Sequence, residues 1–307
     1  MNKMPPRLPS VLVVGVNGLI GHNLYIHFKN SGWLTFGISH HPGSDVAFSF
    51  DLYHPDYQSL ESMANQVDFA IICSAITNIE RCKNEPSAYQ FNVINTIDLI
   101  DYLCRLNVIP IFLSTNMVFK GTSRYYYEDD DRYPTTTYGR HKRAVEDYLL
   151  KSGRPFLILR LCKVIGVEYQ DGTLLTGFLD RLRSGKEIIC ARDQYLSFTY
   201  VGDLIRALQM LITSKSYGIF HISSIEIFSR LELAVQVAYF FQLDQKYIIP
   251  CFMEELDFSE PRPQHNSLDS TRIIGMFGFS FSNLQNCLSM IKTNYENTQS
   301  LKQAIHF

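Results

Sequence analysis

The chain has 307 residues, of which 46% are hydrophobic, and its formal net charge is -2. This length and composition allow a full hydrophobic core, in one large domain or in a domain with a smaller lobe. The sequence has no long Lys/Arg block and no stretch near the roughly 18 apolar residues of a membrane span, which argues against nucleic-acid and membrane partners. We therefore expect a globular cytoplasmic protein.

Seven cysteines are scattered along the chain without a Cys-x-x-Cys pair. An odd number in this arrangement fits neither a framework of paired disulfides nor a zinc site. We therefore expect reduced thiols and no bound metal.

Over residues 11–160, short β-branched runs alternate with longer amphipathic segments, which is typical of β-α-β units in a parallel sheet. The predicted strands, each buried on both faces, are residues 11–14, 34–38, 69–73, 109–114 and 156–161. The predicted helices are residues 19–29, 87–105 and 137–150, where apolar residues recur at helical spacing. Right-handed crossovers then place helices on both faces of one sheet.

Beyond residue 160 the alternation is looser. The predicted elements are helices at residues 174–182, 201–211 and 230–241, strands at 188–191 and 219–222, and a C-terminal helix after Pro261-Arg262-Pro263. The pattern predicts an α/β fold of the Rossmann type, with a doubly wound parallel sheet in residues 1–160. Residues 161–307 are predicted to form a smaller α/β substrate lobe, interleaved with the last elements of the sheet.

A glycine-rich turn, Gly15-x-x-Gly18-x-x-Gly21, follows the first predicted strand and opens the first helix. In such a turn the first glycine allows the bend, the second lets the backbone approach a pyrophosphate, and the third permits close packing of helix on sheet. The helix N-terminus then faces the phosphates. This context predicts an NADP or NAD site, whose contacts here are Gly15, Asn17, Gly18, Leu19, Ile20 and Gly21.

The sequence defines the contacts to the adenosine ribose less clearly. A carboxylate at the end of the second strand would bind the 2′-hydroxyl of NAD, but residues 37–41 read Gly-Ile-Ser-His-His and contain no acid. This favours NADP over NAD, with Ser39 and His40 as candidate contacts. Asp51, which ends the next apolar stretch, either borders the adenine ring or caps a turn.

Tyr138 and Lys142 are four residues apart on a predicted helix, so both side chains project from one face. We expect the ammonium to lower the pKa of the phenol, which lets the tyrosine exchange a proton with a substrate oxygen. Thr115, directly after a strand, would polarise the same carbonyl while a nicotinamide supplies hydride. A second pair with this spacing, Tyr25 and Lys29, has no strand-end hydroxyl near it, and we interpret it as structural.

Together these motifs resemble the extended short-chain dehydrogenase/reductase family over nearly the whole chain. Within that family the chain is most similar to the dTDP-4-dehydrorhamnose reductase group and its relative, the regulatory subunit of methionine adenosyltransferase. Besides the glycine loop and the Tyr138/Lys142 pair, the segments that carry the resemblance are Asp51-Leu52, Cys73-Ser74-Ala75, Asn92-Val93-Ile94-Asn95-Thr96, Leu113-Ser114-Thr115-Asn116-Met117-Val118-Phe119, Tyr127-Glu128-Asp129, Arg160-Leu161, Asp193-Gln194 and Pro261-Arg262-Pro263 with Asn266, Ser267 and Leu268.

The resemblance implies a catalytic triad of Thr115, Tyr138 and Lys142, with Lys142 also holding the nicotinamide ribose. The further cofactor contacts that it implies are Asp51, Leu52, Ser74, Ala75, Ile76 and Asn92. It implies a nucleotide-linked sugar as substrate, with candidate contacts at Thr77, Asn116, Val118, Phe119 and Arg262. The implied reaction is the NAD(P)H-dependent reduction of a 4-keto (deoxy) sugar nucleotide in carbohydrate biosynthesis, and a homodimer is one open oligomeric state.

The chain departs from that group at three positions. Asn116 follows the threonine where Asp is usual, Phe198 takes the place of a proline, and Lys163 stands where relatives carry apolar, aromatic or small residues. Two other functions stay open. One is a sugar-nucleotide epimerase or dehydratase that retains NAD, although a dehydratase would carry an acid pair at Asn116 and Met117. The other is a regulatory subunit that binds NADP without turnover.

Overall fold

The computed structural model describes residues 8–41 and 48–305, and the chain divides into two compact units. The first unit contains the chain up to Val118, Thr136–Arg160 and Ile205–Phe220. The second contains Phe119–Thr135, Leu161–Leu204 and the chain from His221 onward. Residues 119–135 thus belong to the second unit although they lie between two segments of the first.

A parallel sheet forms the centre of the first unit, with seven strands among the described residues in the order β11-β6-β5-β4-β1-β2-β3. The strands are β1 (Ser10–Val14), β2 (Leu34–Ser39), β3 (Phe48–Ser49), β4 (Phe69–Ile72), β5 (Ile109–Thr115), β6 (Leu157–Leu161) and β11 (Gly218–Ile222). Strand β1 pairs in parallel with β2 and with β4. The pairs β2–β3 and β4–β5 are also parallel. The chain reverses its direction of growth across the sheet between β1 and β4. This is the point at which doubly wound sheets bind ligands, outside the carboxyl ends of the strands.

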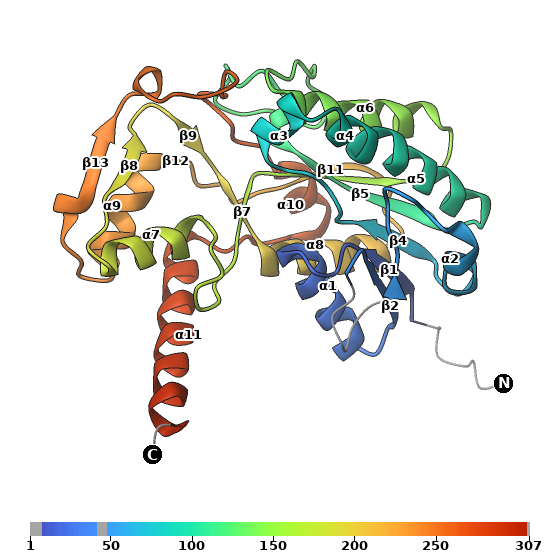
Figure 1. Cartoon of the computed structure of the whole chain (residues 1–307), viewed down its shortest axis with the longest axis horizontal. Coiled ribbons are helices and arrows are strands. Elements are labelled where there is room, and N and C mark those ends of the chain that lie inside the picture. Colours follow the sequence, from blue (N-terminus) through green and yellow to red (C-terminus); the bar gives the residue numbers. More distant parts are fainter. Residues whose placement is uncertain (1–7, 42–47, 306–307) are drawn as a thin grey trace. The chain divides into compact units, whose positions relative to one another are not determined.

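Helices cover both faces of this sheet (Figure 1). One face carries α2 (Tyr57–Ala64), α5 (Thr96–Arg105) and α6 (Thr137–Lys151), whose apolar side chains share a core with alternate strand residues. The other face carries α1 (Leu19–Asn30) and α8 (Val201–Thr213), where His27 and Gln209 form a hydrogen bond of 2.7 Å. The predicted doubly wound α/β fold is therefore confirmed.

Two sequence predictions for this unit need correction. The helix expected over residues 87–105 is interrupted: α3 (Ile79–Asn84) and α4 (Pro86–Tyr89) lead into a π-helical segment, Gln90–Asn95, before α5 begins. The wider π turn is held by the Asn95 amide, which donates to the carbonyl of Leu52 at 2.7 Å. In addition, β2 is not buried on both faces along its length, because its first residue, Leu34, is 44% exposed.

The second unit packs helices against three short strand pairs. The pairs are β7 (Lys163–Ile165) with β10 (Phe198–Tyr200), β9 (Tyr195–Leu196) with β12 (Phe228–Ser229), and β8 (Ile188–Ala191) with β13 (Ile248–Cys251). The helices are α7 (Leu174–Arg183), α9 (Arg230–Phe240), α10 (Thr271–Phe277) and α11 (Leu284–Ile305). One apolar core unites α7, α9 and the first half of α11. A capping box in which Ser229 and Glu232 bind each other's backbone N–H fixes the start of α9.

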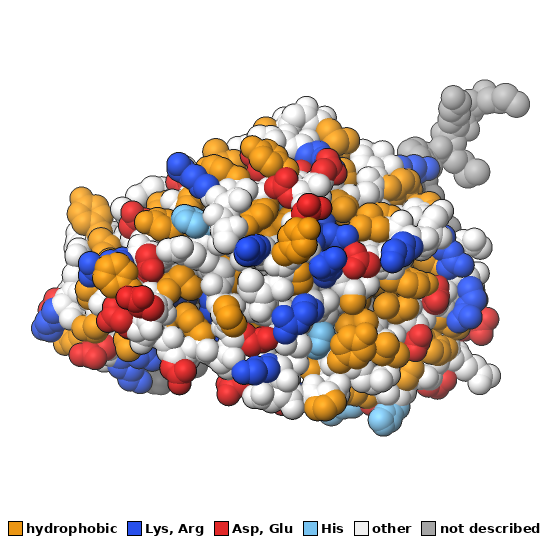
Figure 2. Space-filling model, turned by 90° about the horizontal axis from the view of Figure 1, so that it is seen from above, with side chains coloured by type: hydrophobic (Ala, Val, Ile, Leu, Met, Phe, Trp, Pro, Cys, Tyr) orange, Lys and Arg blue, Asp and Glu red, His pale blue; other side chains and the backbone are white. Residues whose placement is uncertain are grey.

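The face drawn in Figure 2 carries Lys and Arg side chains interspersed with Asp and Glu, without a continuous basic surface. In the described part of the chain, no helix is both long enough and apolar enough to cross a bilayer.

Candidate active site

The glycine loop lies at the carboxyl end of β1, beside the end of β4. Gly15 has φ +92°, and a Cβ there would lie 2.4 Å from the Ser74 hydroxyl oxygen. A Cβ on Gly21 would lie 2.2 Å from the Gly15 carbonyl oxygen, so the protein itself requires both glycines. Gly18 differs, because a Cβ there would meet only that carbonyl, at 3.7 Å. The absence of a side chain at Gly18 is instead what close approach of a ligand requires.

The N-terminus of α1 is suited to a phosphate group. Gly18 is its N-cap, no side chain caps it, and the helix runs for 12 residues, so the amides of Leu19 and Ile20 lie in its first turn. The Asn17 side chain donates instead to the carbonyl of His41 and ties the loop to the segment after β2. These features fit the pyrophosphate of a dinucleotide.

The loop after β4 faces the glycine loop and is held from behind by the π-helical segment. The Asn92 amide oxygen accepts from the Ile76 N–H at 2.8 Å, and its nitrogen donates to the Ile76 carbonyl at 2.9 Å. Ser74 and Ala75 are half-buried in this loop, and Thr77 is exposed. Asn92 therefore acts as a clamp for the residues expected along the cofactor.

The residues expected near the adenosine end gather after β2 and β3. Ser39 ends β2 and is buried, whereas His40 is exposed and its Nδ1 lies 3.2 Å from a carboxylate oxygen of Asp51. Asp51 also accepts from the Tyr53 N–H at 2.8 Å, so it caps a turn. Leu52 is buried and offers its carbonyl to the π-helical segment.

Thr115, Tyr138 and Lys142 come from two elements that pack together, the end of β5 and the start of α6. The Thr136 hydroxyl caps α6 by accepting from the Gly139 N–H at 3.1 Å, so Tyr138 lies in the first turn. Lys142 is buried and donates to the Leu113 carbonyl at 2.8 Å. The Thr115 hydroxyl donates to the Asn116 side chain at 3.2 Å.

The pKa directions at this site differ from the sequence expectation. Burial raises the pKa of Tyr138, and the charge of a Cys82 thiolate would raise it further. Burial also lowers the pKa of Lys142 to about 8. The Lys142 ammonium lies 6.0 Å from the centre of the Tyr138 ring and is bound to a backbone carbonyl. The expected lowering of the tyrosine pKa is therefore wrong for the protein alone, because burial raises this pKa instead.

A buried ion pair behind β5 was not foreseen. Glu146, one turn after Lys142, binds the Arg160 guanidinium through two N–H···O bonds of 3.0 and 2.8 Å and accepts from the Ser114 hydroxyl at 2.5 Å. The sequence signal was an arginine inside the otherwise apolar strand β6, Leu-Ile-Leu-Arg-Leu. The negative charge of Glu146 raises the pKa of Lys142, against the effect of burial.

The expected substrate contacts are divided between the two units, with Thr77, Asn116 and Val118 in the first and Phe119 and Arg262 in the second. Val118 and Phe119 are completely buried, and Phe119 stacks on Tyr126 with ring centres 4.4 Å apart, which leaves no side-chain surface for a ligand. Asn116 is buried beside Thr115. Arg262 lies in the second unit, with its guanidinium 5.3 Å from the centre of the Phe258 ring.

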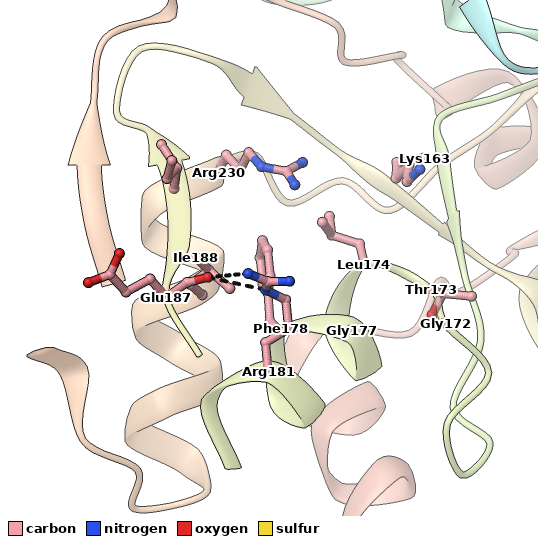
Figure 3. Close-up of a pocket in the computed structure, with 11 residues that line it drawn as sticks. Lys163, Gly172, Thr173, Leu174, Gly177, Phe178, Arg181, Glu187, Ile188 and Arg230 are labelled. Atoms are coloured by element: carbon pink, nitrogen blue, oxygen red, sulfur yellow. Dashed lines mark hydrogen bonds between the residues drawn. The ribbon is translucent and has the colours of Figure 1, made fainter. Parts of the chain in front are cut away.

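A cavity of about 550 Å³ lies within the second unit (Figure 3). Residues from β7, α7, β8 and α9 and from the loop before α7 line it, among them Lys163, Thr173, Phe178, Arg181, Ile188 and Arg230. Its volume is typical of a small-molecule site, and it combines apolar walls with cations. Sequence reasoning marked Lys163 as unusual but missed Arg181 and Arg230, because no local motif links them.

The described residues do not form a metal site. No group of three or more His, Cys, Asp or Glu side chains in residues 8–41 and 48–305 is arranged to hold an ion. All seven cysteines lie in these ranges as free thiols.

Comparisons with known proteins agree with this geometry. The family model described as RmlD substrate binding domain matches residues 9–296. A probable low-salt glycan biosynthesis reductase, Agl14, of Haloferax volcanii is 27% identical, over 94% of this chain and 99% of its own. Methionine adenosyltransferase 2 subunit beta of Danio rerio is 26% identical, over 86% of this chain and 83% of its own.

Among solved structures, a dTDP-4-dehydrorhamnose reductase of Bacillus anthracis in complex with NADP superposes with a TM-score of 0.79. It shares 20% identity, over 94% of this chain and 99% of its own, and it supports the fold. Because the family match covers nearly the whole chain, the protein belongs to the RmlD substrate binding domain family.

Proposed function

We propose that the protein is an NAD(P)H-dependent reductase that converts the keto group of a 4-keto sugar nucleotide to a hydroxyl. The observation that carries this proposal is the packing of α6 on β5. It brings the helix of Tyr138 and Lys142 against the strand end of Thr115, in the unit whose glycine loop fits a dinucleotide. The related glycan biosynthesis reductase and dTDP-4-dehydrorhamnose reductase support the same chemistry.

The cofactor is NADP or NAD, held by the N-terminus of α1, the loop Ser74–Ile76 and the residues after β2. The open space before Gly18 supports this assignment. When bound, NAD(P)H supplies the hydride that adds to the keto carbon.

The proton for the new hydroxyl comes from Tyr138. The phenol donates its proton to the keto oxygen as hydride adds to the keto carbon. The Thr115 hydroxyl polarises the same oxygen after turning from Asn116, and Lys142, fixed on the Leu113 carbonyl, holds the cofactor ribose.

The substrate nucleotide is bound by the cavity of the second unit. Arg230 and Arg181 suit its diphosphate, and Phe178 and Ile188 offer apolar surface for its base.

A screen of NADPH and NADH oxidation against a panel of 4-keto-6-deoxy sugar nucleotides tests the proposal. Tyr138→Phe should lower turnover by about 100-fold or more while cofactor binding survives, because the proton donor is lost. Tyr25→Phe is the matched control, because Tyr25 has the same spacing to a lysine, Lys29, as Tyr138 has to Lys142. The Tyr25 side chain is buried in α1, outside the proposed catalytic group, so its loss should not affect turnover. Stoichiometric NAD⁺ in the purified protein, with no net NADPH oxidation on any substrate, would favour an epimerase.

A non-catalytic, NADP-binding regulatory subunit is the second candidate. It is favoured by the 26% identity to methionine adenosyltransferase 2 subunit beta. In that case Tyr138→Phe would leave the biological activity unaltered, and no panel member would be reduced.

A further inference from the structure

The cavity of the second unit has an unusual concentration of positive charge. Lys163 begins β7, Arg181 lies near the end of α7, and Arg230 is the first residue of α9. All three line one cavity, and Arg230 extends across it toward the side where Lys163 lies (Figure 3). Three elements therefore direct cations to a single volume.

No carboxylate balances these cations. Glu187 is the acidic residue of the lining, but its carboxylate points away from the cavity in Figure 3. Its backbone carbonyl accepts from the Arg181 guanidinium at 3.2 and 2.5 Å. In the described part of the chain, none of the three cations lies within 4.0 Å of an acidic side chain. The positive charge is therefore available to a ligand.

Lys163 and Arg230 repel each other in the protein alone. Lys163 is exposed to solvent in part, yet desolvation by the surrounding protein lowers its pKa, and the charge of Arg230 lowers it further. Two like charges that face one cavity without a counter-ion favour an anionic ligand, because its binding removes their repulsion. The Arg230 guanidinium also lies 5.3 Å from the centre of the Phe178 ring, which orients it without neutralising it.

A nucleotide-linked neutral sugar does not use all of this charge. Its diphosphate carries two negative charges, which Arg230 and Arg181 can match. Lys163 is left over, on the side of the cavity with Thr173 and away from Arg181 (Figure 3). A third negative charge on the ligand would complete the balance.

We propose that the sugar of the substrate carries a carboxylate and that Lys163 binds it, so that the protein acts on a nucleotide-linked acidic sugar. This inference rests on the proposed function and narrows its substrate class. Lys163 is then a specificity-determining residue, which favours an acidic over a neutral sugar without taking part in proton transfer.

Isothermal titration calorimetry tests the proposal with two probe pairs, UDP-glucose with UDP-glucuronic acid and the corresponding dTDP-sugars. We expect the wild-type protein to bind the acidic sugar nucleotide about tenfold more tightly, which is typical of a hydrogen bond to a charged group. Lys163→Met should abolish this preference and keep the affinity for the neutral sugar. Lys151→Met removes one exposed lysine from the end of α6 and should leave the preference intact.

Each other result overturns the inference. If the wild-type protein binds both sugars equally, or prefers the neutral sugar, it does not recognise a carboxylate on the sugar. An equal loss for both sugars in Lys163→Met means that Lys163 binds the diphosphate instead. These results, and failure of all four probes to bind, overturn the inference and leave the proposed function in place, whereas a lack of NADPH and NADH oxidation with every member of the 4-keto sugar nucleotide panel removes both together.

Discussion

Replacing Glu146 with alanine tests the buried ion pair behind β5. Glu146 is 0% and Arg160 1% exposed, so the substitution removes the carboxylate that accepts from a guanidinium with almost no access to water. Removing one partner of such a pair typically costs about 3–5 kcal/mol. The Ser114 hydroxyl also loses its acceptor, which adds about 1 kcal/mol.

The loss is large beside the roughly 5–15 kcal/mol by which folded proteins are usually stable. Equilibrium urea unfolding measures it as a lower midpoint at an unchanged slope. Glu146→Leu combined with Arg160→Met should recover most of the stability, because both charges leave together. Glu85→Ala breaks the exposed Arg81–Glu85 pair and should change little. If Glu146→Ala lowers the free energy of unfolding by less than about 1 kcal/mol, the pair is not a desolvated ion pair. The same conclusion follows if the double variant is no more stable than Glu146→Ala.

Three further predictions concern the same unit. Gly18→Ala should weaken NADPH binding with little change in melting temperature, because its Cβ makes only an ordinary contact of 3.7 Å within the protein, whereas Gly21→Ala should destabilise the fold through a 2.2 Å contact; thermal shift with and without NADPH separates the two. Asn92→Ala should cost about 1–3 kcal/mol in urea unfolding, since the Ile76 backbone loses both of its bonds to this side chain. The pKa of Lys142 falls from 10.5 to about 8 on folding, so the unfolded chain binds more protons between these values and stability should rise with pH there. Lys142→Met should lack that rise, and a parallel rise in the variant would show that another group causes it.

Local patterns predicted the first unit well because its elements are specified locally. The strand, glycine loop and helix from Ser10 to Asn30 follow from a β-branched run and three glycines, and the structure agrees within one residue at each end. The π-helical segment escaped prediction, since one added residue per turn hardly alters the apolar spacing over Gln90–Asn95. In the second unit, the strand predicted at residues 188–191 is confirmed as β8, but its partner β13 was not predicted, because a run of four residues that pairs so far along the chain carries no readable alternation. The charged cavity escaped for the same reason, because its lining side chains meet through tertiary packing.

The pair Tyr138 and Lys142 illustrates what spacing does and does not determine. Four residues of separation on a helix place the two side chains on one face, and the structure keeps them there. Spacing says nothing about the solvent around the phenol or the partner of the ammonium. Burial raises the tyrosine pKa and lowers the lysine pKa, while the ammonium donates a hydrogen bond to the Leu113 carbonyl. The partner expected for the ammonium, the phenol, is therefore replaced by a backbone carbonyl at the strand end. Under the proposed function, Lys142 acts mainly as a support for the strand end and for the cofactor ribose, because its ammonium is directed to the backbone.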